Sequence, residues 1–149
     1  MTAPSGMDRL LGEWDTAGSM DVDGRTIAIT GHTSIEPLGE FVVLRTTVQP
    51  AEFPDSVSII GGAPADAPAP MHYFDERGVQ RLYLSSVEAD RWVIELADTE
   101  LGMSPGFEQR YVGEISADGS RITGAWERGV GESDHRWEVD FTFDFVRVG

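Results

Sequence analysis

Apolar and polar side chains alternate with a period of two along most of the chain from Glu13 onward. The clearest run covers residues 136–148, where acidic and hydroxyl side chains alternate with large apolar ones. The apolar set consists of Trp137, Val139, Phe141, Phe143 and Phe145. Successive side chains of a β-strand point to opposite faces of its sheet, so this run predicts a strand with one face in the core.

The same period recurs in nine earlier segments that are separated by turn residues, such as the hairpin dipeptide Asp23-Gly24. These segments are residues 12–21, 25–37, 40–49, 56–62, 71–75, 79–86, 91–97, 107–116 and 120–128. Short strands without a long helix between them predict an antiparallel meander, which must close or stack to remove its edges. Consecutive hairpins favour closure over a sandwich. We therefore predict an all-β, up-and-down barrel of about eight to ten strands.

The N-terminal segment is the one place with a helical signal, because Leu10 and Leu11 can anchor one short helical turn. A chain of 149 residues fits a single domain over residues 1–149, of which we expect 1–9 to be a flexible N-terminus. The first twelve residues have no basic region followed by an apolar run. The sequence thus predicts no secretory signal and a cytoplasmic location.

The composition excludes several classes of function. The chain has no Cys, so it offers no thiolate nucleophile and no Cys-ligated metal site. Its eleven basic residues are all Arg and stand against 26 acidic ones, which gives a net charge of −15. A field of that sign repels phosphate backbones and anionic lipid, so we expect neither nucleic acid nor a membrane as a partner.

The stretch "LLGEW" carries a family resemblance through Gly12 and Trp14. It resembles the Gly-x-Trp opening of the calycin superfamily, the lipocalins and fatty-acid-binding proteins. The resemblance implies that the Trp closes the base of the barrel and that an Arg of the last strand, here Arg147, packs across it. This contact would be a structural cation–π interaction.

Two longer strings, "YFDERGVQRLY" and "PGFEQRYVGEISADGSRITGAWE", extend the resemblance. Together with the closing strand they are similar to a family of uncharacterised bacterial proteins, common in actinomycetes, that are built as lipocalin-like barrels. The resemblance covers about residues 10–147. It implies the fold, but it carries no activity and no catalytic residue.

Arg81 and Tyr83 are the first candidate ligand-binding residues. Fatty-acid-binding proteins hold a carboxylate with an Arg and a Tyr two apart on an inward strand face, and this pair resembles that arrangement. Strand geometry places Arg81 and Tyr83 on one face and Leu82 and Leu84 on the other. We expect the two leucines to face the core, which would leave Arg81 in solvent. The alternative is an inward Arg81–Tyr83 pair.

Residues 107–128 supply further candidates. Gln109 and Tyr111 share the more aromatic face of one strand, and Trp126 and Arg128 share a face of the next. We expect both faces to point inward, where Gln109 needs a hydrogen-bond partner. Three tryptophans could line the same lumen: Trp92, Trp126 and Trp137. They could equally form a packed aromatic core.

His72 is a candidate inward residue beside Phe74, and it could form an acid–base pair with Asp75 or Glu95. A haem-binding barrel of the nitrobindin type would need an axial His and alternating glycines after the Trp, and residues 14–18 match that pattern poorly. No two His stand at a metal-ligand spacing. We therefore expect no metal and no cofactor.

Three functions remain open. The preferred one is a barrel that binds a small apolar or amphipathic molecule in its lumen. The second is a small enzyme with isomerase-like or cyclase-like acid–base chemistry, although no sequence motif specifies it. The third is a packed barrel that acts through its outer surface, as a homodimer.

Overall fold

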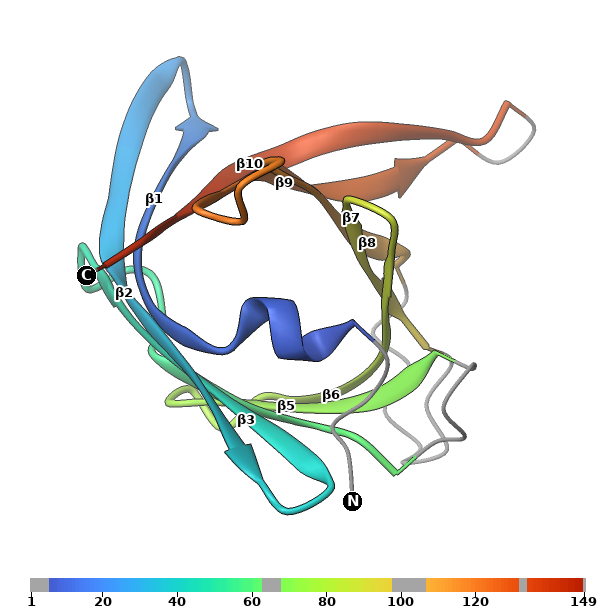
Figure 1. The fold of residues 1–149 in the computed structure, drawn as a ribbon. Helices are drawn as coiled ribbons and strands as arrows, with labels where there is room; N and C mark the ends of the chain where they lie inside the picture. Colours follow the sequence, from blue (N-terminus) through green and yellow to red (C-terminus); the bar gives the residue numbers. More distant parts are fainter. Residues whose placement is uncertain (1–5, 63–67, 98–106, 132–133, 149) are drawn as a thin grey trace.

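A computed structural model describes residues 6–62, 68–97, 107–131 and 134–148. Its ten strands form one closed antiparallel barrel, in which each strand pairs with the next and β10 pairs with β1 (Figure 1). The predicted all-β, up-and-down barrel is therefore confirmed. The strands are β1 (Gly12–Val22), β2 (Arg25–Leu38), β3 (Phe41–Gln49), β4 (Ser56–Ile60), β5 (Ala69–Asp75), β6 (Gln80–Glu88), β7 (Arg91–Leu96), β8 (Gln109–Ile115), β9 (Arg121–Val130) and β10 (Arg136–Arg147).

Successive strand connections lie at opposite ends of the barrel, because every neighbouring pair of strands is antiparallel. The β1–β2 turn is the hairpin expected from Asp23-Gly24, and both residues have positive φ, 49° and 78°, as a type I′ turn requires. The end that holds this turn and the β3–β4 and β5–β6 connections is called the mouth below. The opposite end, which receives the N-terminal segment, is called the base.

A short 3₁₀ helix, η1 (Met7–Leu10), closes the base. It lies across the inside of the ring of strands (Figure 1), and its Met7 and Leu10 side chains are buried. The expected flexible N-terminus covers residues 1–9, of which 1–5 lie outside the described residues. Residues 7–9 belong to this helix, which is favoured because its two apolar anchors leave water. Within the described residues, no helix is long and apolar enough to cross a membrane.

Arg147 links the η1 helix to the barrel. Its guanidinium carbon lies 4.1 Å from the centre of the Trp14 ring, which is the contact that the calycin resemblance implies. The same guanidinium donates hydrogen bonds to the carbonyl oxygens of Leu11 (2.7 Å), Arg9 (2.8 Å) and Gly119 (3.3 Å). Trp14 in turn donates its Nε1 proton to the Leu10 carbonyl at 2.9 Å. Arg147 therefore joins both ends of the chain at the base.

The half of the barrel nearer the base, which we call the lower half, is a packed aromatic core. Trp92 and Tyr111 lie edge to face with their ring centres 5.6 Å apart, and the Tyr111 hydroxyl donates to the carbonyl of Phe143 at 2.8 Å. A Cβ atom at Gly124 would lie 2.5 Å from that hydroxyl oxygen. The hydroxyl therefore reaches the backbone of β10 only because residue 124 is glycine.

A β-bulge in β10 changes which of its side chains face inward. Val139 pairs with Glu127, but Phe141 pairs with the adjacent Trp126, so Asp140 is an extra residue between them. The expectation that Trp137 and Val139 share the core face with the three phenylalanines is therefore wrong. Val139 is 60% exposed, because an extra residue reverses the in–out alternation on one side of a bulge.

Candidate functional site

The upper half of the barrel holds a cavity of about 570 Å³ that opens at the mouth. Its walls are mostly apolar and aromatic, and they include Leu44, Met71, Ile94, Trp126, Phe141 and Phe143. The polar groups include three arginines and two carboxylates: Arg77, Arg81, Arg128, Glu52 and Asp140. An apolar cavity with a few polar groups is the usual form of a small-molecule site.

The Arg81–Tyr83 face of β6 points into this cavity. The expectation that Leu82 and Leu84 face the core is wrong, since Leu84 is 39% exposed on the outer surface and Tyr83 is 2% exposed. The reason is that the Tyr83 ring can be buried at little cost, because its hydroxyl donates a hydrogen bond to Gln109 Oε1 at 2.8 Å. The more polar face of this strand is thus the inner one.

The Tyr83 ring is the centre of an aromatic wall. It lies edge to face with Tyr73, 6.0 Å between ring centres, and with Trp126 at 5.6 Å. Burial raises the pKa of Tyr83 above its ordinary value. Arg81 is half-buried beside this wall, and its guanidinium carbon lies 5.2 Å from the Phe107 ring centre. This cation–π contact with Phe107 favours a position of the Arg81 guanidinium at the mouth.

Arg77 is already neutralised by Asp75. The Asp75 side chain is fully buried and accepts hydrogen bonds from Arg77 Nη2 at 2.6 Å, from Arg77 Nε at 3.2 Å and from the Tyr73 hydroxyl at 2.8 Å. Burial alone would raise the pKa of Asp75, but these hydrogen bonds outweigh it and lower the pKa to about 2. Burial and the same hydrogen bond raise the pKa of Tyr73. This network is a structural element of the cavity wall.

Arg81 and Arg128 are the cations left available at the mouth. No ion pair with a carboxylate joins either of them among the residues that the structure describes. Asp140 also lines the cavity, because the bulge in β10 turns it inward. Bulges commonly re-aim a side chain beside a binding site. The mouth thus presents guanidinium groups with carboxylates near them.

The remaining candidates divide between the cavity and the core beneath it. Gln109 and Trp126 line the cavity together with Arg128, as expected from the alternation of β8 and β9. Tyr111 and Trp92 also point inward, but each is only 1% exposed and lies in the packed lower half. The lumen is therefore neither entirely hollow nor entirely packed.

His72 does not face the lumen, and its expected inward position beside Phe74 is wrong. It is exposed on the outer surface, whereas Met71 and Tyr73 on either side of it point inward. The acid–base pair with Asp75 is not formed, because His72 and Asp75 are three positions apart in β5, and side chains an odd number of positions apart in a strand face opposite sides of the sheet. Glu95 is likewise on the outer surface. Neither of the other two histidines lines the described part of the cavity.

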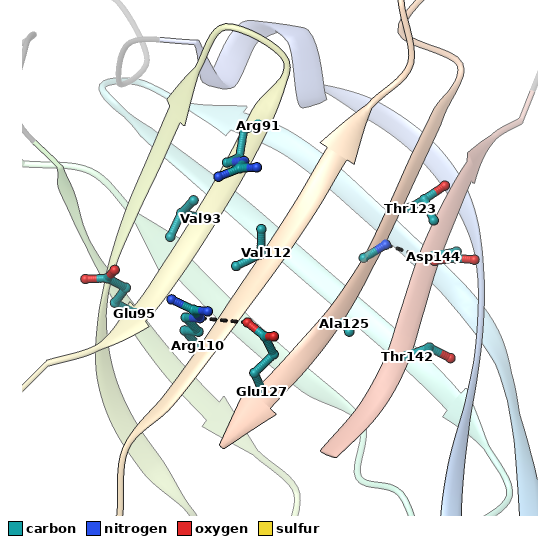
Figure 2. Close-up of a pocket in the computed structure, with 11 residues that line it drawn as sticks. Arg91, Val93, Glu95, Arg110, Val112, Thr123, Ala125, Glu127, Thr142 and Asp144 are labelled. Carbon is teal, nitrogen blue, oxygen red and sulfur yellow. Dashed lines mark hydrogen bonds and ion pairs between the residues drawn. The ribbon is translucent and has the colours of Figure 1, made fainter. Parts of the chain in front are cut away.

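A larger but shallower hollow, of about 690 Å³, lies on the outer surface of β7 to β10 (Figure 2). Two of its arginines are already paired: Arg110 Nε donates to Glu127 within the hollow at 2.7 Å, and Arg91 pairs at 2.9 Å with Glu114, which lies outside it. Asp144 accepts from the Gly124 backbone N–H at 3.0 Å. Because these groups already have partners and the hollow lies on the outer surface, we place the candidate site in the lumen instead.

Sequence reasoning missed three parts of the site. The loop before β4 contributes Phe53, the β5–β6 turn contributes Arg77 with its partner Asp75 at the end of β5, and the bulge contributes Asp140. The spacing Asp-x-Arg across a Gly-containing turn could have indicated the ion pair. The regular alternation of residues 136–148 gives no sign of the bulge.

Comparisons with known proteins bear on the fold alone. No protein-family model matches the chain, and no curated protein is significantly similar to it. Sixteen chains of solved structures are similar. One is the crystal structure of Rv2717c from M. tuberculosis, which has a TM-score of 0.70 and a sequence identity of 13% to this chain. The alignment covers 96% of this chain and 95% of the Rv2717c chain. The likeness of the two chains therefore extends over the whole barrel.

Proposed function

We propose that the protein binds a small amphipathic molecule in the upper half of its barrel. The observation that carries this proposal is the cavity of about 570 Å³ at the mouth, which falls within the roughly 300–1,000 Å³ of typical ligand pockets. A net charge of −15 supports the related proposal that nucleic acid and anionic membranes are not partners.

The apolar part of the ligand would lie against the aromatic wall. Met71, Ile94, Trp126 and Phe143 give the cavity an apolar wall, and the packed aromatic core lies between this wall and the base. An apolar body therefore loses most contact with water when it enters from the mouth, which supplies the main favourable free energy of binding.

The polar part of the ligand would remain at the mouth, beside Arg81 and Arg128. Arg77 contributes less, because its guanidinium is engaged by Asp75. Guanidinium groups donate several hydrogen bonds in a planar fork and suit an acidic or strongly polar acceptor. We therefore expect a ligand with an acceptor group at one end.

The first test is native mass spectrometry of the protein purified from its own cells, beside Arg81→Ala and Arg128→Ala. A stoichiometric adduct that is lost from one of the variants supports the proposal and identifies the anchoring arginine. Arg91→Ala is the matched control, because Arg91 lies on the outer surface and its loss should leave the adduct in place.

The second test uses two fluorescent probes of similar size. These are the anionic 1-anilinonaphthalene-8-sulfonate and the neutral N-phenyl-1-naphthylamine. Both should bind at one site and quench the tryptophan fluorescence, and Arg81→Ala should weaken only the anionic probe, by roughly 10-fold. A protein that yields no adduct and binds neither probe does not have this function.

A further inference from the structure

The outer surface of β3 to β6 differs in composition from the rest of the barrel. The strand register places outward side chains of these four strands in rows across the sheet. One row consists of Val43, Ile59, His72 and Leu82. Beyond Val43 in the direction of β2, the next residue in this row is acidic, because Val43 pairs with Glu36.

The two adjacent rows have the same character. One consists of Arg45, Val57, Phe74 and Gln80. The other contains Pro70 and its partner Leu84, and the next residue in this row is Glu95 on β7, which pairs with Leu84. The outward side chains of β3, β4, β5 and of β6 as far as Leu84 form what we call the carboxylate-free face. It carries no acidic side chain, although the chain contains 26 of them.

This face is also apolar and open to solvent. Phe41, Phe74 and Leu84 are 40%, 41% and 39% exposed, respectively. Acidic residues surround the face, with Glu40 and Glu76 in the turns at its two ends and Glu36 and Glu95 at its sides. An apolar patch with a polar rim is the usual anatomy of a protein interface.

We propose that this face binds a second copy of the same chain across a two-fold axis. Two copies that each carry a charge of −15 repel each other through most of their surfaces. The carboxylate-free face lets them approach without placing acidic groups opposite one another at the centre of the contact. A basic partner would instead be attracted to the acidic surface elsewhere.

The size of the face predicts how strong the dimer is. Four strands about 4.8 Å apart, with about five residues of about 3.3 Å each, give a footprint of roughly 300 Å². A stable interface covers about 800 Å² on each partner, so the rim must supply the remainder. Because that rim is acidic, the dimer is weak and reversible, and added salt strengthens it by screening the repulsion.

Sedimentation velocity over a series of protein concentrations, at low and at high salt, tests the proposal. The wild-type protein should shift from monomer to dimer, and more so at high salt. Leu84→Glu should weaken dimerisation by roughly 100-fold, because two carboxylates would enter an apolar contact. Val146→Glu is the matched control, since Val146 is 42% exposed on β10, outside the face, and this variant should dimerise almost as the wild type does.

Chemical cross-linking gives a second test that does not depend on an added charge. The chain has no Cys, so His72→Cys places a single thiol near the middle of the face. A short bis-maleimide should join two such chains, whereas Val146→Cys should remain monomeric. A wild-type protein that stays monomeric at every concentration and salt, or equal cross-linking of the two Cys variants, overturns the proposal and leaves the face to another partner.

Discussion

The Asp75 network gives the sharpest prediction, because its contacts define both its size and its pH dependence. The Asp75 side chain is fully buried, and its pKa falls from an ordinary 3.8 to about 2. A carboxyl whose pKa is lower in the folded state stabilises the fold at pH values above its unfolded pKa. That contribution is lost as the pH falls through the folded pKa. The loss should therefore run from about pH 4 to about pH 2.

The magnitude follows from the two pKa values. A difference of almost two pH units corresponds to about 2.5 kcal/mol at neutral pH. Water screens the charge of Arg77, whose side chain is 52% exposed, and this screening lowers the contribution to about 1–2 kcal/mol. Asp75→Asn should therefore lower the free energy of unfolding by about 1–2 kcal/mol at pH 7, and this deficit should shrink by roughly half at pH 3.

Urea unfolding followed by tryptophan fluorescence at pH 7 and pH 3 measures this deficit. Glu36→Gln is the control, since it removes an exposed carboxylate on β2 and should change stability little at either pH. If the deficit of Asp75→Asn is the same at both pH values, ionisation of the hydrogen-bonded carboxylate does not stabilise the fold.

Three further predictions concern the base, the core and the outer surface. Arg147→Ala should lower the free energy of unfolding by about 3 kcal/mol in a denaturant titration, because three backbone hydrogen bonds and the Trp14 contact are lost together. Arg147→Lys should recover less than half of that loss. Gly124→Ala should cost about 2 kcal/mol or more, since its Cβ would meet the Tyr111 hydroxyl. Two contacts would remain in a Tyr111→Phe background, 2.6 Å to the Val112 carbonyl oxygen and 2.7 Å to the ring carbon Cζ, so most of the cost should persist there. A Gly124→Ala protein as stable as the wild type would contradict this account of the packing. Arg91→Ala should change stability by less than about 1 kcal/mol, since its ion pair is exposed on both sides; a larger loss in the same titration would show that the outer hollow is more than a solvated surface.

The alternation of side chains predicted the strands well where one face was clearly the more aromatic. Residues 107–116 and 120–128 became β8 and β9, and Tyr111 and Trp126 point inward as expected. In such segments the burial of large rings outweighs every other local term, so the pattern alone determines the orientation.

The alternation could not orient β6, where both faces contain large side chains. Leu82 and Leu84 compete with Tyr83 for the interior, and the outcome depends on a hydrogen bond from Tyr83 to Gln109. These two residues are 26 positions apart in the chain. Local sequence carries no information about such a partner.

The sequence by itself determined the all-β class, the hairpins and the meander, because a period of two and turn residues are local properties of the chain. Only the tertiary structure decided which end of the barrel is packed and which is hollow, since that depends on side chains from ten strands meeting in one layer. It also decided, through one extra residue in β10, that Asp140 reaches the cavity while Trp137 does not line it. A bulge shifts the register against a neighbouring strand, and register is a relation between two segments that neither segment contains alone.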